Sequence, residues 1–233
     1  MSCRIAVLAS GRGSNLEALL DYLAIHPSSA AVTLVASDKP GAGALAIARA
    51  RDIQVSTLDM GESHEVSLAT LLEDHASNLV VLAGYLSLVP SAVIQSFRGR
   101  MLNVHPALLP AFGGKGMYGA RVHRAVLASG ARISGATVHF VDEVYDHGAI
   151  IAQWPVPVYG DDSETTLAMR VLRAEHSLLP CVVNAVASGR ITLGADNRVR
   201  GVMEATASGA GFVLLHDQNL DGAIEAALAL ADS

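Results

Sequence analysis

Apolar runs alternate with amphipathic segments along most of this chain. Residues 4–9, 31–36 and 78–84 are dominated by Val, Ile, Leu and Ala, and shorter runs occur at 53–58 and around Asn103. Such runs predict strands that are buried on both faces of a sheet. The segments between them, at about 14–23, 44–51, 65–75 and 90–97, predict helices. The alternation indicates an α/β fold with a doubly wound, mostly parallel, Rossmann-like sheet.

The pattern changes in the second half of the chain. It predicts a helix at 122–129, strands at 135–141 and 150–158, a long helix from about 163 to 188 and a hairpin at 191–203. Pro155 and Pro157 indicate that the last long strand lies at an edge or contains a bulge. We expect one domain over residues 1–204. Residues 205–233, with a linker at 206–211, a strand at 212–216 and a helix at 222–231, predict a short extension that is not an independent domain.

A glycine-rich turn joins the first strand to the first helix. Gly11 and Gly13 would let the backbone approach a ligand closely, and a helix N-terminus suits an anion such as phosphate. Ser14 and Glu17 have the spacing of a capping box, which predicts the start of the helix. The third glycine of a dinucleotide-binding fingerprint is replaced by Leu16. A tight turn without a ligand is the alternative interpretation.

Asn103 and His105 are two positions apart at the end of the fifth predicted strand, so their side chains lie on the same face. Prolines at 106 and 110 end the strand, and open α/β sheets place their chemistry at such strand ends. A glycine-rich loop at 111–119 and an acidic turn at 142–147 follow. The alternative is a buried histidine with a satisfied hydrogen bond beside an asparagine in a turn.

Composition narrows the possible partners. The chain has 233 residues, of which 51% are hydrophobic and 16% charged, and its formal net charge is −6. The lack of a basic cluster argues against nucleic acid, and the lack of a long apolar run argues against a membrane span. We therefore expect small-molecule substrates, and a monomer or homodimer. Two cysteines and no signal peptide predict a cytoplasmic protein. No metal-ligand spacing is present. We interpret His139 and His176 as structural, and expect that His123 can reach the site from the helix after the glycine-rich loop.

Several of these motifs together resemble phosphoribosylglycinamide formyltransferase of purine synthesis, a branch of the folate-dependent formyltransferases. The resemblance rests on the turn at 10–15, on Asn-Val-His-Pro-Ala-Leu-Leu-Pro at 103–110, on the turn from Val138 to Asp146 and on Glu175-His176. The order and spacing match over nearly all of residues 4–203. The resemblance implies a formyltransferase of Rossmann-like fold that uses 10-formyltetrahydrofolate as co-substrate and needs no metal.

The resemblance also implies roles for individual residues. Asn103 and protonated His105 would donate hydrogen bonds to the oxyanion of a tetrahedral intermediate, while Asp146 would favour the charged histidine and help to move the proton. The residues implied for the acceptor, glycinamide ribonucleotide, are Gly11, Arg12, Gly13, Ser14, Asn15 and Glu175. Those implied for the folate are His64, Leu86, Ser87, Leu88, Val89, Val141, Asp142, Glu143, Val144 and Tyr145, together with Asn103 and Asp146.

The sequence departs from the family near the expected folate tail. Ser87 and His64 stand where members of the family often have arginines, so the resemblance does not imply a strong charged contact with that tail.

Three alternatives to this function would use part of the same pattern. Formyltetrahydrofolate deformylase would use the same trio with water as acceptor, but would carry an added amino-terminal domain. Methionyl-tRNA formyltransferase would carry a basic RNA-binding domain. A non-catalytic nucleotide-binding module would use the Gly11 turn and Asp38, and would leave Asn103, His105 and Asp146 unexplained.

Overall fold

The computed structural model describes residues 2–26, 30–61, 63–201 and 214–215. The predicted linker at 206–211 and the helix at 222–231 lie outside the described residues. Of the strand expected at 212–216, the structure describes Leu214–Leu215. None of the described helices combines the length and apolarity needed to cross a bilayer.

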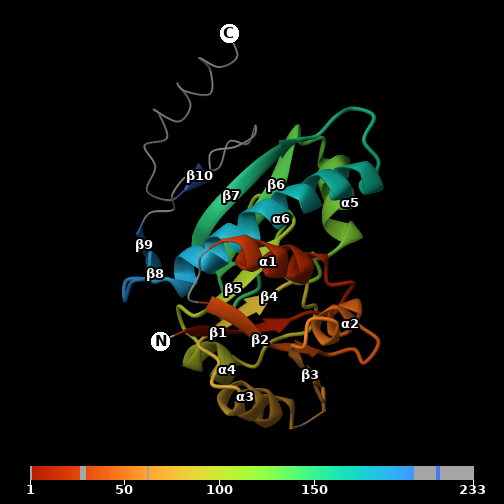
Figure 1. Ribbon diagram of the computed structural model, residues 1–233. Coiled ribbons are helices and arrows are strands. Elements are labelled where there is room, and N and C mark those ends of the chain that lie inside the picture. The colour runs from red at the N-terminus through yellow and green to blue at the C-terminus, as the bar shows by residue number, and fades with distance from the viewer. Residues whose placement is uncertain (1, 27–29, 62, 202–213, 216–233) are drawn as a thin grey trace.

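The described strands form one large sheet and a separate hairpin (Figure 1). The sheet has eight strands in the order β10-β7-β6-β5-β4-β1-β2-β3. Strands β1 to β5 are parallel, as predicted, whereas β6, β7 and β10 are antiparallel. The strand bounds are β1 Cys3–Leu8, β2 Ala30–Ser37, β3 Gln54–Thr57, β4 Leu79–Leu82, β5 Met101–His105, β6 Ile133–Phe140, β7 Ile150–Pro157, β8 Ile191–Leu193, β9 Val199–Gly201 and β10 Leu214–Leu215.

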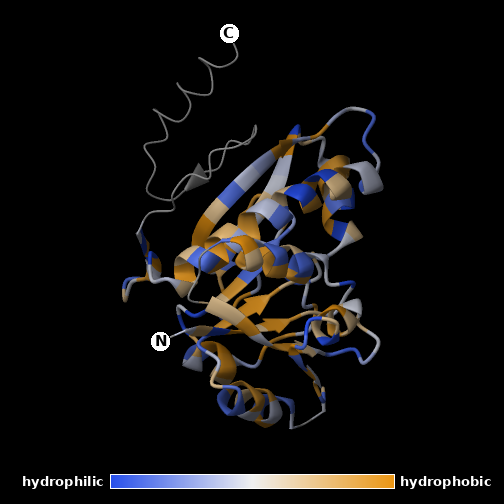
Figure 2. Cartoon of the chain, in the orientation of Figure 1, coloured by the Kyte–Doolittle hydropathy of each residue, from blue (hydrophilic) through white to orange (hydrophobic). Residues whose placement is uncertain are grey.

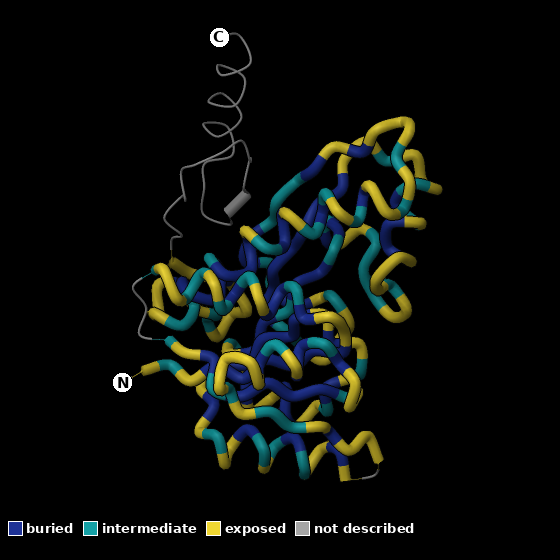
Figure 3. Tube along the Cα trace, turned by 45° about the vertical axis from the view of Figure 1, so that its right-hand side comes forward, coloured by how far each residue is buried: buried dark blue, intermediate teal, exposed yellow. Residues whose placement is uncertain are grey.

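Helices cover both faces of the sheet (Figure 1), and the central strands β1 and β4 are apolar and largely buried on both sides (Figures 2 and 3). In β1, Ile5 and Val7 face one core, and Ala6 and Leu8 face the other. The first core is completed by α1 Ser14–Ile25, α2 Gly43–Arg49, α5 Ala120–Ser129 and α6 Glu164–Ala187. The second is completed by α3 His64–Asp74 and α4 Ser91–Ser96. Each fully buried aliphatic side chain contributes roughly 1.5–3 kcal/mol to folding.

The capping box predicted at Ser14 is wrong. Gly13 occupies the N-cap position of α1 in a left-handed conformation (φ 89°), and no side chain caps the helix. A Cβ atom at residue 13 would lie 2.7 Å from the Cα of Ala44, so the turn needs glycine to pack against α2. Helix α6, by contrast, has a complete capping box between Ser163 and Thr166.

The two prolines of β7 agree with an edge position. Strand β10 pairs with β7 at Ala152 and Gln153, so Pro155 and Pro157 lie where no described strand pairs with the outer edge. Their inner neighbours are in β6. The register of this ladder shifts at Ile151 of β7, which has no partner between the pairs Val138–Ala152 and His139–Ile150, so β7 also contains an irregularity, away from the prolines. Proline is tolerated there because the missing N–H group would face away from the sheet.

Candidate active site

The sheet order places a cavity where open α/β sheets bind ligands. Strand β1 lies between β2 and β4, so the chain reverses its direction of winding there, and the crevice beyond the carboxyl ends of these strands is the expected binding site. A cavity of about 740 Å³ lies at this point, lined by the turns after β1 and β4, by β5, by residues 141–146 and by α6. Its size suits a substrate of moderate size.

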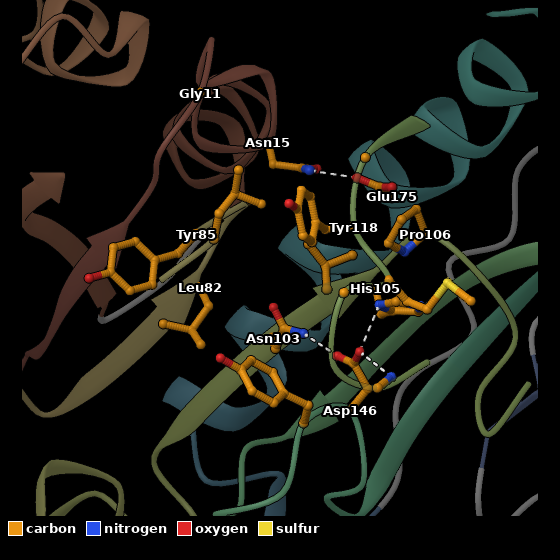
Figure 4. A pocket seen from close by; sticks show the side chains of 18 of the residues that line it. Gly11, Asn15, Leu82, Tyr85, Asn103, His105, Pro106, Tyr118, Asp146 and Glu175 are labelled. Carbon is orange, nitrogen blue, oxygen red and sulfur yellow. Dashed lines mark hydrogen bonds and ion pairs between the residues drawn. The ribbon is translucent and has the colours of Figure 1, made fainter. Parts of the chain in front are cut away.

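Asn103, His105 and Asp146 meet in this cavity (Figure 4). The Nδ2 atom of Asn103 lies 3.4 Å from Oδ1 of Asp146, and Nδ1 of His105 lies 3.4 Å from Oδ2. Side chains alternate between the two faces of a strand, so Asn103 and His105 of β5 share one face. The turn after β6 brings the carboxylate of Asp146 to the same face. The predicted grouping of the trio therefore agrees with the structure, while the roles of the three residues stay predictions.

His139, which the sequence alone indicates to be a structural residue, orients the side-chain amide of Asn103. Nδ1 of His139 lies 2.8 Å from the Phe140 carbonyl, so it carries the hydrogen, and Nε2 must accept from Asn103 Nδ2 at 3.1 Å. This requires a neutral ring, and burial lowers the pKa of His139. Asp146 is also an acceptor. Because two acceptors face the same end of Asn103, that end is the nitrogen.

Hydrogen bonds from β6 and β7 hold the loop that follows β5. The Thr137 hydroxyl donates to the Ala107 carbonyl at 2.6 Å and accepts from the N–H of Leu109 at 3.1 Å. Gln153 donates to the Leu109 carbonyl at 2.9 Å. These bonds keep the loop residues after His105 against the sheet, so the histidine is built on a rigid support.

A second polar pair lies at the other end of the cavity, between α1 and α6 (Figure 4). Nδ2 of Asn15 donates to Oε2 of Glu175 at 2.6 Å, and both residues are buried. The other amide atom of Asn15, Oδ1, is buried without a protein partner among the described residues. Burial raises the pKa of Glu175 to about 7, although the bond from Asn15 opposes this. A free acceptor beside a carboxyl group near its midpoint is suited to ligand hydroxyl groups.

The raised pKa of Glu175 predicts a loss of stability as pH rises. The folded state holds this proton more tightly than the unfolded chain, whose pKa is near 4.5, so stability falls between about pH 4.5 and 7. The contribution is on the order of 3 kcal/mol. Urea unfolding of the ligand-free protein at pH 5, 6, 7 and 8 should show this fall, and Glu175→Gln should remove it. The exposed Glu17→Gln is the control, and equal slopes for all three proteins would contradict the assignment.

The glycine-rich turn between β1 and α1 lies beside that pair. Arg12 is the one Lys or Arg among the described cavity-lining residues, whereas five carboxylates line the cavity. Helix α1 begins at Ser14, and its first N–H groups have no acceptor within the helix. Gly11, Arg12 and Asn15 line the cavity, but Gly13 and Ser14 do not. Glycine at position 13 is thus explained by its packing against α2 and not by contact with the cavity. An anion would approach this turn from the side of Gly11 and Arg12.

The residues expected to bind folate form an apolar rim. Six of the large apolar side chains that are exposed in the described chain line this cavity, and grouped exposure of this kind is typical of a binding surface. They are Leu86, Leu88, Tyr118, Val144, Tyr145 and Met169. Tyr118 and Met169 were not among the residues predicted for the folate. The other predicted folate residues that line the cavity are Ser87, Val89, Asn103, Val141, Asp142, Glu143 and Asp146.

His64 and Ser87 differ in their placement. His64 does not line the cavity; it begins α3, it is buried, and its Nδ1 lies 3.0 Å from the Asp59 carbonyl. Ser87 lines the cavity and donates to Oδ2 of Asp38 at 2.7 Å. The serine thus satisfies one oxygen of Asp38, while the other, Oδ1, is buried without a hydrogen-bond partner among the described residues. The role of His64 and Ser87 in folate binding stays a prediction.

Helix α6 forms one wall of the cavity, of which the sequence predicted Glu175 but not Thr165 or Ala168. Thr165, Ala168, Leu172 and Glu175 all line the cavity. Their spacing of three to four residues puts them on one face of the helix, so counting back from Glu175 would have found the others. His123 of α5, expected from the sequence to reach the site, lines the cavity, is buried, and has its pKa lowered by burial and then by the charge of His105. Among the described residues, no group of three or more His, Cys, Asp or Glu side chains could hold a metal ion.

Comparison with known proteins agrees with this geometry. The formyl transferase family matches residues 3–183. The chloroplastic phosphoribosylglycinamide formyltransferase of Arabidopsis thaliana is 42% identical over 194 residues, which are 81% of this chain and 66% of that protein. The Escherichia coli K12 phosphoribosylglycinamide formyltransferase is 36% identical over 81% of this chain and 89% of its own. Glycinamide ribonucleotide transformylase 1 from Symbiobacterium toebii has a TM-score of 0.79 at 36% identity, over 86% of this chain and 94% of that one.

The matched proteins differ in length and in identity. The chain spans less than two thirds of the plant relatives it matches, 66% of the Arabidopsis protein and 64% of the one from Vigna unguiculata. A formyltetrahydrofolate deformylase from Pseudomonas syringae has a TM-score of 0.78 but only 24% identity, so that likeness concerns the fold alone.

Proposed function

Because the chain belongs to the formyl transferase family, we propose that it transfers the formyl group of 10-formyltetrahydrofolate to the amine of 5-phosphoribosylglycinamide in de novo purine synthesis. The products are the N-formyl compound and tetrahydrofolate. The observation that carries the proposal is that one cavity holds Asn103, His105 and Asp146 at one end and Arg12, Asn15 and Glu175 at the other. These groups match the reacting centre and the ribose phosphate of the acceptor.

The chemical step needs a nucleophile, an oxyanion site and a path for one proton. The acceptor amine attacks the formyl carbon, a carbon–nitrogen bond forms, and the carbonyl oxygen becomes an oxyanion. Nδ2 of Asn103 and Nδ1 of His105 each lie 3.4 Å from one oxygen of Asp146, so an oxyanion that sits beside both nitrogens would accept a hydrogen bond from each. The bond to N10 of the folate then breaks, and the proton lost by the amine is delivered to that nitrogen through Asp146.

The two substrates would occupy different parts of the cavity. The ribose hydroxyls of the acceptor would meet the unpaired Oδ1 of Asn15 and the carboxyl of Glu175, and the phosphate would meet Gly11, Arg12 and the start of α1. The flat pterin would lie between the turn at 86–89 and the turn at 141–146. Apolar contacts dominate there because the exposed rim is aliphatic and aromatic.

The test is tetrahydrofolate formation from 10-formyltetrahydrofolate with and without 5-phosphoribosylglycinamide. We expect turnover only with the acceptor, because the amine is the nucleophile. Equal turnover without it would indicate water as the nucleophile, and would support the deformylase alternative instead. Absence of turnover in both reactions would reject the proposed function.

The wider setting of the protein is also proposed. Small molecules are its substrates, and we propose a monomer or homodimer in which residues 1–204 form the catalytic domain and 205–233 an extension. The cytoplasmic location expected from the sequence stays a prediction, because the word chloroplastic describes the Arabidopsis relative. Sedimentation of the full chain would decide the oligomeric state.

A further inference from the structure

The segment Phe112–Gly114, which begins the glycine-rich loop after β5, contacts both titratable members of the trio. The carbonyl oxygen of Phe112 lies 2.9 Å from Nε2 of His105. The N–H group of Gly114 donates to Oδ2 of Asp146 at 2.9 Å, and that oxygen also lies 3.4 Å from Nδ1 of His105. A closed circuit of backbone and side chain therefore joins the loop to the histidine and the aspartate. We call residues 112–114 the clasp.

The clasp constrains the protonation of His105. A backbone carbonyl only accepts, so Nε2 of His105 must carry a hydrogen. With that hydrogen in place, a neutral ring would turn the lone pair of Nδ1 towards the carboxylate of Asp146. The imidazolium form instead donates at both nitrogens. The other titratable side chains close to the ring, His123 and His139, have pKa values lowered by burial, so in their neutral form they add no opposing charge.

Backbone conformation shows that the clasp is built into the fold. Phe112 and Asp146 are non-glycine residues with positive φ, both 55°, a conformation that costs about 1 kcal/mol or more and tends to occur at functional sites. The Phe112 side chain packs against the main core, which anchors its carbonyl. A Cβ atom on Gly113 would lie 2.5 Å from Leu109 Cδ2 and 3.1 Å from Asp146 Cβ. Glycine at 113 thus allows the loop to approach the aspartate.

We infer that the Phe112 carbonyl and the Gly114 N–H group position His105 and Asp146 for formyl transfer, and that Gly113 is needed because the two hydrogen bonds require this close approach. Both hydrogen bonds of the clasp go to the catalytic side chains, so it is a positioning element. Its loss should lower kcat and leave both KM values nearly unchanged. This kinetic part rests on the proposed function.

The kinetic test compares Gly113→Ala with Lys115→Ala in the full chain. The added methyl group of Gly113→Ala crowds both Leu109 and Asp146, so the loop and the aspartate must shift apart slightly. We expect kcat to fall about 10- to 100-fold with each KM within about threefold of wild type. Lys115, an exposed residue two positions further along the loop that does not line the cavity, should have no effect when changed to alanine. Urea unfolding would verify that both variants fold. Wild-type kcat in a folded Gly113→Ala protein would overturn the inference while leaving the proposed function intact.

A second test needs no substrate. Hydrogen exchange of the Gly114 amide, followed by nuclear magnetic resonance, should be slow in the wild type and roughly tenfold or more faster in Asp146→Ala, because the acceptor is gone. Amides in α3 serve as the internal control. Unchanged exchange at Gly114 would overturn the clasp. If the wild type fails to transfer formyl groups, the proposed function is rejected, and this measurement decides the clasp by itself.

Discussion

Asp146→Asn should reduce kcat by about 10³-fold at neutral pH, because asparagine can neither take up the proton of the amine nor hold the positive charge on His105. Asp146 is the residue on which the trio converges, 3.4 Å from both Asn103 and His105. Substrate binding should change little, since the carboxylate acts on the reacting atoms. Steady-state kinetics for both substrates would give the separate values of kcat and KM.

A matched control for this variant is Asp52→Asn. Asp52 is exposed and has nearly the same φ angle as Asp146, 56° against 55°, so it controls for the substitution at a positive φ. It should have wild-type kinetics. An unchanged kcat in Asp146→Asn would leave Asp146 without a catalytic role.

His105 and Asp146 should also behave as one unit. The double variant His105→Ala/Asp146→Asn is expected to be scarcely worse than the poorer single variant, because each residue acts through the other. Losses that simply multiply would show independent roles, and the circuit through the Gly114 amide and the Phe112 carbonyl would then have no common function.

The fold and the position of the site could be predicted because both follow from local patterns. The apolar runs gave the parallel strands β1 to β5 within a few residues, since residues buried on both faces leave no polar alternation. The period of two along β5 placed Asn103 beside His105. The hydrophobic pattern does not give the antiparallel direction of β6 and β7. The direction of a strand depends on whether the connecting segment returns to the sheet at the same end or at the opposite end.

The features that were missed depend on contacts between distant segments. The helix α1 is capped by a left-handed Gly13 because the turn must pack against Ala44, and no rule based on neighbouring residues includes that contact. The orientation of Asn103 by His139 requires the pairing of β5 with β6. The raised pKa of Glu175 follows from burial between α1 and α6, which the helical pattern alone does not give.

Asn103→Ala should lower kcat by about 10²- to 10³-fold, the loss expected when one oxyanion donor is removed. The KM values for both substrates should change by no more than about threefold, because the donor acts on charge that develops only in the transition state. His105 and Asp146 keep their mutual contact and both bonds to residues 112–114 in this variant, so the proton path remains.

The sharper variant is Asn103→Asp, which keeps the shape of the side chain and removes the donor. If Asn103 is the oxyanion donor, Asn103→Asp should be at least as impaired as Asn103→Ala, since a carboxylate would face both the lone pair of His139 and the carboxylate of Asp146. Measured at pH 7.5 with both substrates saturating, a kcat of Asn103→Asp near that of wild type would exclude the donor role, because no other group at that position could supply the hydrogen.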